Sequence, residues 1–324
     1  MEYLSKIKQP INEELSHFES HFKKTMNTNV PLLDIVLKYM IRRKGKQIRP
    51  MFVFLTAKLL GDIKNSAYTA ASLIELLHTA TLIHDDVVDD SYKRRGYFSL
   101  NALWKSKITV LVGDYLLSRG LLLAIDNKEY ELLEIVSNAV REMSEGELLQ
   151  VKKSRKVYID EAEYFEIIKK KTASLISSCA SCGAKAAGAD EETVKIFHDF
   201  GEKVGLAFQI KDDLLDYQNA RRIGKPTGND IREKKVTLPL IYALKNADDK
   251  SKKAIKKAFG KKSKTKGEVQ QIVDFAKRHN GIKAAEDKMH VLKNEALEML
   301  ESFEDNEAKQ GLTELVKFTV EREK

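Results

Sequence analysis

The chain has 324 residues, of which 43% are hydrophobic and 32% are charged, and its formal net charge is +8. These proportions are those of a globular protein and exclude a disordered or collagen-like chain. Residues 1–15 mix charges of both signs and contain no apolar core, which is not the pattern of a signal peptide. No run approaches the ~18 apolar residues that span a bilayer. We therefore expect a cytoplasmic protein.

Apolar residues at helical spacing predict helices along almost the whole chain. One example is the set Leu73, Leu76, Leu77, Ala80 and Ile83. Alternating strand-like patterns are not evident. The expected helix breaks lie near residues 61–62, 94–96, 126–128, 155–159, 188–190, 224–228 and 247–250. We predict an all-α fold of about ten or more helices, and a single domain that covers residues 1–324.

Two aspartate clusters carry the strongest chemical indication. They are Asp85-Asp86-Val87-Val88-Asp89 and Asp212-Asp213-Leu214-Leu215-Asp216. Each places two aspartates at i and i+4 on one helix face, where like charges destabilise a helix unless something neutralises them. One such cluster is more often a solvated acidic face. Two copies inside apolar helices instead predict a Mg²⁺–diphosphate site, because Mg²⁺ is held by carboxylates together with substrate phosphates.

Basic residues accompany both clusters. The candidates for binding phosphate are Lys46 and Arg49 before Pro50, Arg94 and Arg95 after the first cluster, and Lys171, Lys225 and Lys235 around the second. His78 lies two helical turns before Asp85. Each alone has the ordinary interpretation of a surface or turn residue. Together they suit phosphorylated substrates, because Arg and Lys pair with phosphate oxygens.

Two further features have simpler explanations. The basic segment Lys250–Lys266 suits an anionic partner, although a solvated linker is the commoner meaning of such a run. Phe259 is its one aromatic residue, so a nucleic-acid surface is not indicated. Cys179 and Cys182 lack the further ligands of a zinc site, and we expect reduced thiols in helix packing.

Several segments resemble the trans-isoprenyl diphosphate synthases. They are ELLHTATLIHDDVVDDSYKRRG at 75–96, EMSEGELLQ at 142–150, Lys171-Thr172, GLAFQIKDDLLD at 205–216 and GKPTGNDIREKKVTLPL at 224–240. The resemblance spans about residues 42 to 240 in the family's order. It departs from the family's usual pattern at Lys44 and Gln47, where a glycine and an arginine are common.

The resemblance implies an isoprenoid-synthase helical bundle around a central cavity, and it implies roles for individual residues. Isopentenyl diphosphate would be held by Lys46, Arg49, His78 and Arg95. The allylic diphosphate would be held by Arg94, Lys171 and Lys225, with Lys235 nearby. Three Mg²⁺ ions would be bound by Asp85, Asp86, Asp89, Asp212 and Asp216, with Asp213 in support. The allylic cation would be faced by Thr172 and Gln209.

The reaction that the resemblance implies is ionisation of an allylic diphosphate such as farnesyl diphosphate, condensation with isopentenyl diphosphate, and elimination of a proton. Small residues before the first cluster, Ala80 and Thr81, with Leu77 one turn further, leave room for a growing tail. We expect a medium or long product of about six to nine isoprene units, such as a quinone side chain. The resemblance also implies a homodimer formed by two central helices, and we expect peripheral membrane contact for product release.

Two other functions are compatible with the same fold. A terpene cyclase shares the first aspartate motif, but it generally lacks the second and has no need of Lys46 and Arg49. A non-catalytic subunit of a heteromeric prenyltransferase would have lost aspartates or a phosphate-binding lysine, and both clusters here are intact.

Overall fold

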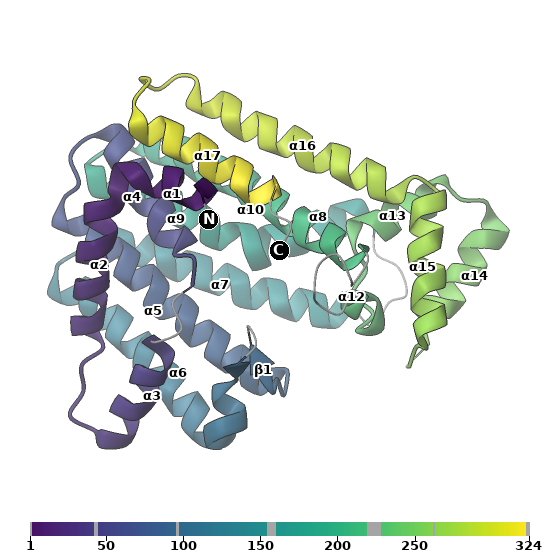
Figure 1. Ribbon diagram of the computed structural model, residues 1–324, viewed down its shortest axis with the longest axis horizontal. Helices are drawn as coiled ribbons and strands as arrows, with labels where there is room; N and C mark the ends of the chain where they lie inside the picture. The colour runs from purple at the N-terminus through teal and green to yellow at the C-terminus, as the bar shows by residue number, and fades with distance from the viewer. Residues whose placement is uncertain are drawn as a thin grey trace. The chain divides into compact units, whose positions relative to one another are not determined.

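The computed structural model describes residues 2–41, 45–94, 97–153, 160–218, 228–261 and 263–321. Within these ranges the chain is helical almost throughout, and the only strands are the antiparallel pair β1 (Lys93–Arg94) and β2 (Tyr97–Phe98). The all-α prediction is therefore confirmed (Figure 1). Helices end at the predicted breaks near 61–62, 126–128, 188–190 and 247–250, whereas the break at 155–159 lies outside the described residues.

The chain divides into two compact units. The first comprises Met1–Val140, Ser178–His198 and Phe303–Leu315, and the second comprises Arg141–Ser177, Asp199–Ser302 and Val316–Lys324. Four long helices contribute residues to both: α7 (Tyr130–Lys153), α9 (Ser174–Ala187), α10 (Glu191–Asp216) and α17 (Glu307–Glu321). The single-domain organisation stays a prediction.

The first unit is built around the packing of two long helices. Its elements are α1 (Glu2–Lys8), η1 (Gln9–Ile11), α2 (Asn12–Thr25), α3 (Pro31–Ile41), α4 (Ile48–Leu60), α5 (Asn65–Val88) and α6 (Leu100–Asp126). Gly120 of α6 allows close approach to α5, because a methyl group placed on it would lie 3.2 Å from the Leu77 Cδ2 atom. Leu76 and Ile83 of α5 are buried in the same apolar cluster as Leu116.

Helix α6 bears on the expectation that no segment of the sequence is apolar enough to span a membrane. Among the described helices it alone is long and apolar enough to cross a membrane, and 33% of its apolar window is buried. Asp114 and Arg119 interrupt the apolar run, which is why no unbroken stretch is visible in the sequence. Both are tied to neighbouring elements: Arg119 donates to the Thr25 carbonyl over 3.0 Å, and Asp114 lies 3.3 Å from the His84 ring. These are the contacts of a helix packed within a protein.

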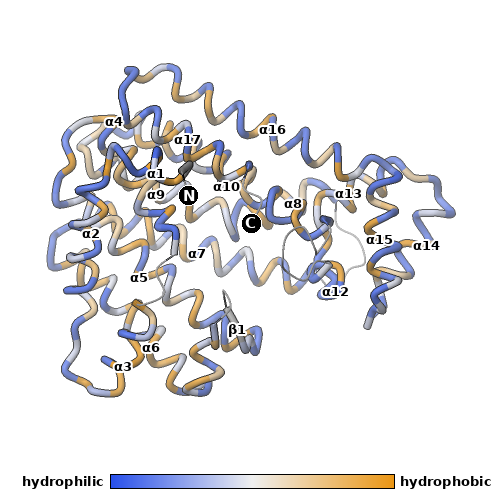
Figure 2. Tube along the Cα trace, in the orientation of Figure 1, coloured by the Kyte–Doolittle hydropathy of each residue, from blue (hydrophilic) through white to orange (hydrophobic). Residues whose placement is uncertain are grey.

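The second unit contains the remaining helices. They are α8 (Glu161–Ile168), the π-helical segment η2 (Lys169–Ala173), α12 (Asn229–Arg232), α13 (Leu238–Asn246), α14 (Asp249–Phe259), α15 (Lys266–Arg278) and α16 (Gly281–Leu300). A capping box at Asp160 begins α8, and another at Thr265 begins α15. Much of the basic segment forms α14, which buries Ile255 and Phe259 and is otherwise largely hydrophilic (Figure 2).

Candidate active site

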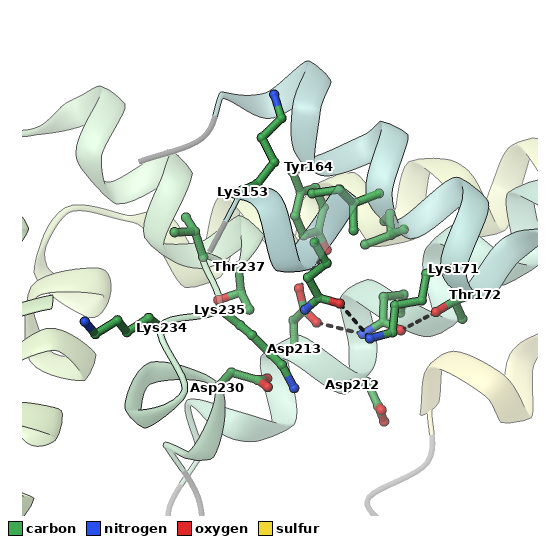
Figure 3. Close-up of a pocket in the computed structure, with 15 residues that line it drawn as sticks. Lys153, Tyr164, Lys171, Thr172, Asp212, Asp213, Asp230, Lys234, Lys235 and Thr237 are labelled. Atoms are coloured by element: carbon green, nitrogen blue, oxygen red, sulfur yellow. Dashed lines mark hydrogen bonds between the residues drawn. The ribbon is translucent and has the colours of Figure 1, made fainter. Parts of the chain in front are cut away.

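A cavity of about 300 Å³ lies in the second unit (Figure 3). Side chains from α7, α8, η2, α10 and residues 230–237 line it. They include six residues singled out from the sequence: Lys171, Thr172, Gln209, Asp212, Asp213 and Lys235. The fold therefore brings the Lys-Thr pair beside the second aspartate cluster, although about 40 residues separate them along the chain.

The Lys-Thr pair owes its position to an irregular helical turn. Residues Lys169–Ala173 form a π-helical turn between α8 and α9, and such turns occur often at functional sites. Glycines flank this turn on two neighbouring helices. A methyl group on Gly146 of α7 would lie 2.7 Å from the Lys171 backbone nitrogen, and one on Gly205 of α10 would lie 2.5 Å from the Ala173 Cα atom. Any larger residue at either position would push the turn away.

Lys171 is held by α7. Its Nζ donates to the Gln150 Oε1 atom over 2.6 Å and also forms an ion pair with Glu147. The lysine side chain is 34% exposed, so its charge is available at the cavity. A bound diphosphate would compete with Glu147 for this ammonium group.

Four side chains form a continuous hydrogen-bonded network beside Lys171. The Thr172 hydroxyl donates to the Gln209 Oε1 atom over 2.7 Å, and the Gln209 Nε2 atom donates to Asp213 over 2.9 Å. The Tyr164 hydroxyl donates to the other carboxylate oxygen of Asp213 over 2.7 Å. Burial raises the pKa of Asp213 to about 7, while the hydrogen bonds from Gln209 and Tyr164 oppose that rise. The hydrogen bond from the Gln209 Nε2 atom to Asp213 holds the Gln209 amide in place.

The other aspartates of the second cluster differ in their surroundings. Asp212 is exposed at the cavity. Asp216 accepts the backbone N–H groups of Asn229 at 3.0 Å and Asp230 at 3.1 Å, and so caps the first turn of α12. Its role as a magnesium ligand stays a prediction.

Asp230 lines the cavity, and the sequence interpretation missed it. Burial, with the nearby Asp216 charge, raises the pKa of Asp230 to about 6. Lys235, which forms a 2.6 Å ion pair with Glu233, opposes this rise. The sequence did contain an indication of its role, because Asp230 is an acidic residue within the segment 224–240 that follows the second cluster.

The first aspartate cluster ends α5 in the first unit. Asp85 and Asp86 lie in its last turn and Asp89 is its C-cap residue. Asp86 is buried, whereas Asp89 is exposed. The C-terminus of a helix carries negative partial charge, and the last turn of α5 contains no basic residue. Both aspartate clusters thus lie at helix C-termini, where a bound cation would neutralise the charge of the carboxylates.

Among the predicted diphosphate-binding residues of the first unit, His78 lies on α5, Arg49 lies in the first turn of α4, and Lys46 precedes α4. Lys46 is exposed, and His78 is half-buried. The Arg49 Nε atom lies 3.1 Å from the Glu75 Oε1 atom. Gln47, one of the two departures from the family pattern, caps α4 in a left-handed conformation with φ of 59°. The side chains of Arg94, Arg95 and Lys225, and the Lys44 position, lie outside the described residues.

The three predicted chain-length residues lie in the third and fourth turns before the end of α5. Ala80 is 1% exposed and belongs to the apolar cluster that contains Leu116 of α6. Leu77 is also buried and faces Gly120. Thr81 is half-buried and donates its hydroxyl to the His78 carbonyl over 2.8 Å. Their effect on product length stays a prediction.

A family model described as "Polyprenyl synthetase" matches residues 30–276. The chain belongs to the polyprenyl synthetase family. The octaprenyl diphosphate synthase of Escherichia coli strain K12 is 37% identical over 257 residues, 79% of this chain and 80% of that one. Other similar proteins are the heptaprenyl diphosphate synthase component 2 of Bacillus subtilis strain 168 and geranylgeranyl diphosphate synthases. As a member of this family, the protein is a prenyltransferase.

Solved structures of polyprenyl synthetases share the fold. A decaprenyl diphosphate synthase from Rhodobacter capsulatus superposes with a TM-score of 0.92 at 34% identity, covering 99% of both chains. A polyprenyl synthase from Caulobacter crescentus CB15, solved with calcium and isoprenyl diphosphate, gives a TM-score of 0.90 at 31% identity, covering 99% of this chain and 98% of that one. The predicted isoprenoid-synthase fold is therefore confirmed.

The donor chemistry of the polyprenyl synthetase motifs fits a hard divalent cation. Carboxylate oxygens are the ligands that Mg²⁺ prefers, and Mg²⁺ typically takes one or two carboxylates and completes its shell with water and phosphate oxygens. Over the described ranges, no group of three or more His, Cys, Asp or Glu side chains is arranged to hold a metal by itself. Each aspartate cluster supplies such oxygens, and the assignment of its aspartates as magnesium ligands stays a prediction.

The two cysteines lie in α9 as buried free thiols, as expected. Gly183, one residue after Cys182, packs directly against α4, since a methyl group on it would lie 2.5 Å from the Val53 carbonyl oxygen. Both thiols are therefore enclosed by helix packing.

Proposed function

We propose that this protein is an all-trans polyprenyl diphosphate synthase that adds isopentenyl diphosphate to an allylic diphosphate such as farnesyl diphosphate, with Mg²⁺. The observation that carries the proposal is the cavity of the second unit, where Lys171, Thr172, Gln209 and Asp212 meet. A cation, two dipolar side chains and an exposed carboxylate are the groups that a metal-assisted ionisation needs.

Each cavity residue has a distinct part in the proposed reaction. Lys171 binds the departing diphosphate and stabilises the charge that develops on it. Thr172 and Gln209 direct oxygen atoms at the allylic cation, and the apolar walls formed by Ile167 and Ile168 exclude water. When Mg²⁺ is bound, it acts as a Lewis acid on the diphosphate. The proton lost in the last step passes to the released diphosphate, since the sequence offers no obvious side-chain base.

We propose a medium or long product of about six to nine isoprene units, from the small side chains before the first cluster. The similarity to octaprenyl and decaprenyl diphosphate synthases supports this length. Geranylgeranyl diphosphate synthases are also similar, so a shorter product is the competing outcome. A product of the proposed length would serve as a quinone side chain.

We also propose a homodimer that uses α6, one of the central helices. Leu111, Leu122 and Ile125 are 58%, 47% and 45% exposed, and the 3.6-residue period places them on one face. The opposite face, with Val112 and Leu116, packs into the first unit. A second copy of the chain would cover the exposed stripe, since such patches typically mark interfaces. The cytoplasmic location and peripheral membrane contact remain expectations of the same proposal.

The purified chain alone tests the function. It should convert isopentenyl diphosphate and farnesyl diphosphate into a longer diphosphate, detected by mass spectrometry, and a chelator should abolish the reaction until Mg²⁺ is restored. Cyclic hydrocarbon products would indicate a terpene cyclase. Activity that appears only when a second polypeptide is added would indicate a partner subunit.

A further inference from the structure

The hydrogen-bonded network at the cavity has a direction, because each of its hydrogen bonds has a defined donor and a defined acceptor. Asp213 is buried at 3% exposure and accepts from two donors, the Tyr164 hydroxyl and the Gln209 Nε2 atom. A glutamine amide has one donor end and one acceptor end. With its Nε2 atom held by Asp213, the amide presents Oε1 to Thr172. The Thr172 hydroxyl proton is therefore donated to the Gln209 Oε1 atom, within the network.

This direction decides what the cavity offers a substrate. Because the Thr172 hydroxyl donates to Gln209, the lone pairs of its oxygen, and not its proton, remain for the cavity. A reversed amide would make Thr172 an acceptor within the network and turn its proton outward. The observed direction suits a developing positive charge, because oxygen lone pairs carry the negative end of the dipole.

Tyr164 stands at the end of this network opposite Thr172 and also lines the cavity. It belongs to α8, is 2% exposed, and packs in an apolar cluster with Ile168, Ile210 and Leu214. Its hydroxyl reaches the Asp213 oxygen that Gln209 does not use. The two donors together fix the carboxylate plane and leave it one orientation toward Gln209. A phenylalanine would fill the same space and lose only the hydroxyl.

We infer that Tyr164 is a positioning residue of the prenyl transfer, which acts through Asp213 to set the direction of the Gln209 amide and hence the oxygen of Thr172 toward the allylic cation. This inference rests on the proposed function. Nothing in the sequence motifs pointed to Tyr164, which lies seven residues before Lys171. The alternative is that Tyr164 only fills the core of the second unit.

Tyr164→Phe separates these roles, with Tyr242→Phe as the matched control. Tyr242 is in the same unit, and its hydroxyl donates to the Glu161 carboxylate over the same 2.7 Å, but neither residue lines the cavity. Tyr164→Phe should lower kcat by about tenfold, the equivalent of ~1.4 kcal/mol, while the KM values for both substrates change less than about twofold. Tyr242→Phe should leave kcat unchanged. Equal kcat values in Tyr164→Phe and the unmodified enzyme would overturn the inference.

A double-mutant cycle tests the route of the effect. If Tyr164 acts through Gln209, Tyr164→Phe should change turnover less than about twofold in a Gln209→Ala background. Effects that multiply would show that Tyr164 acts independently and would overturn the inference. Single-turnover measurement with labelled substrate keeps the slower variants measurable. An unmodified enzyme that forms no prenyl product would instead refute the proposed function, so the two failures are distinguishable.

The variant Asp213→Asn is a second test of the direction of the hydrogen bond between Gln209 and residue 213. An asparagine amide can donate to the Gln209 Oε1 atom, so the Gln209 amide can reverse. The kcat of Asp213→Asn should therefore fall further than that of Tyr164→Phe. A kcat above that of Tyr164→Phe would contradict the assigned direction.

Discussion

The Arg49 guanidinium of α4 and the Glu75 carboxylate of α5 form an ion pair, with 3.1 Å between Nε and Oε1. Both side chains are about one-fifth exposed, at 20% and 22%. The pair joins the segment before Pro50, for which we propose phosphate binding, to the helix that carries the first aspartate cluster. Arg49 therefore has a structural contact in addition to its proposed substrate, and its side chain is less exposed than that of Lys46, three residues earlier.

This difference predicts distinct outcomes for two neighbouring substitutions. Lys46→Ala and Arg49→Ala should each raise the KM for isopentenyl diphosphate with little change in kcat, because they remove uniform binding of a non-reacting diphosphate. Arg49→Ala should also destabilise the protein by about 2 kcal/mol, since it leaves the Glu75 carboxylate without its ion pair. Steady-state kinetics and urea unfolding measure the two effects. A raised KM for the allylic primer alone would mean that the pocket is misassigned.

The aspartate clusters should show a trade-off between activity and stability. Asp85→Ala and Asp212→Ala should each lower turnover by at least about a hundredfold, because they remove ligands that stabilise the leaving group. Each should also raise the unfolding free energy of the metal-free protein by about 0.3–1 kcal/mol, because a negative charge leaves a helix C-terminus. Asp274→Ala on α15 is the control, and it should change neither the turnover nor the unfolding free energy of the metal-free protein. Near-normal turnover in either variant would remove that residue from the mechanism.

Enlarging the side chains before the first cluster should shorten the product. Ala80→Tyr and Thr81→Phe should each reduce it by several isoprene units while the first condensation continues. Ala80 is fully enclosed, so its replacement should also cost about 1–3 kcal/mol through overpacking. Thr79→Phe, an identical change on a different face of α5, should leave product length unchanged. Mass spectrometry of the products decides, and unaltered lengths in both test variants would refute the tunnel hypothesis.

The exposed stripe of α6 predicts the assembly state. The unmodified protein should be a homodimer at micromolar concentration by light scattering. Leu111→Glu and Leu122→Glu should each shift it to monomer, because a buried unpaired carboxylate opposes association. Val291 of α16 is 46% exposed and serves as the control, since Val291→Glu should leave the dimer intact. A stable monomer of the unmodified chain would contradict the proposal.

The buried thiols should be inert in the native protein. Burial raises the pKa of Cys179 from its ordinary value of 9.0 to about 12 and raises that of Cys182 well above 9.0. The thiolate is the reactive form, so iodoacetamide at pH 8.5 should modify neither cysteine until urea unfolds the chain. Because the folded pKa lies above the unfolded one, the stability that the Cys179 thiol contributes is complete below pH 9 and is lost as the pH rises toward 12. Modification of the folded protein would contradict the burial.

Sequence alone determined the fold class, the family, the aspartate motifs and their basic companions. Helical spacing of apolar residues is a local property, and the aspartate motifs are short continuous segments, so both are visible without coordinates. The sequence also located the helix end near Asp126 and the break before Asp190, where turn-forming residues interrupt the apolar pattern.

Tertiary structure decided the rest, because the deciding contacts join residues far apart in the chain. Helical spacing cannot show that Lys169–Ala173 is a π turn, or that Gly146 and Gly205 of two other helices pack against it. Nor can it show that Asp213 is buried and accepts a hydrogen bond from Tyr164 while its neighbour Asp212 is exposed at the cavity. Adjacent residues in a helix point about 100° apart, so burial of one carboxylate and exposure of the next is set by packing partners that the motif does not contain.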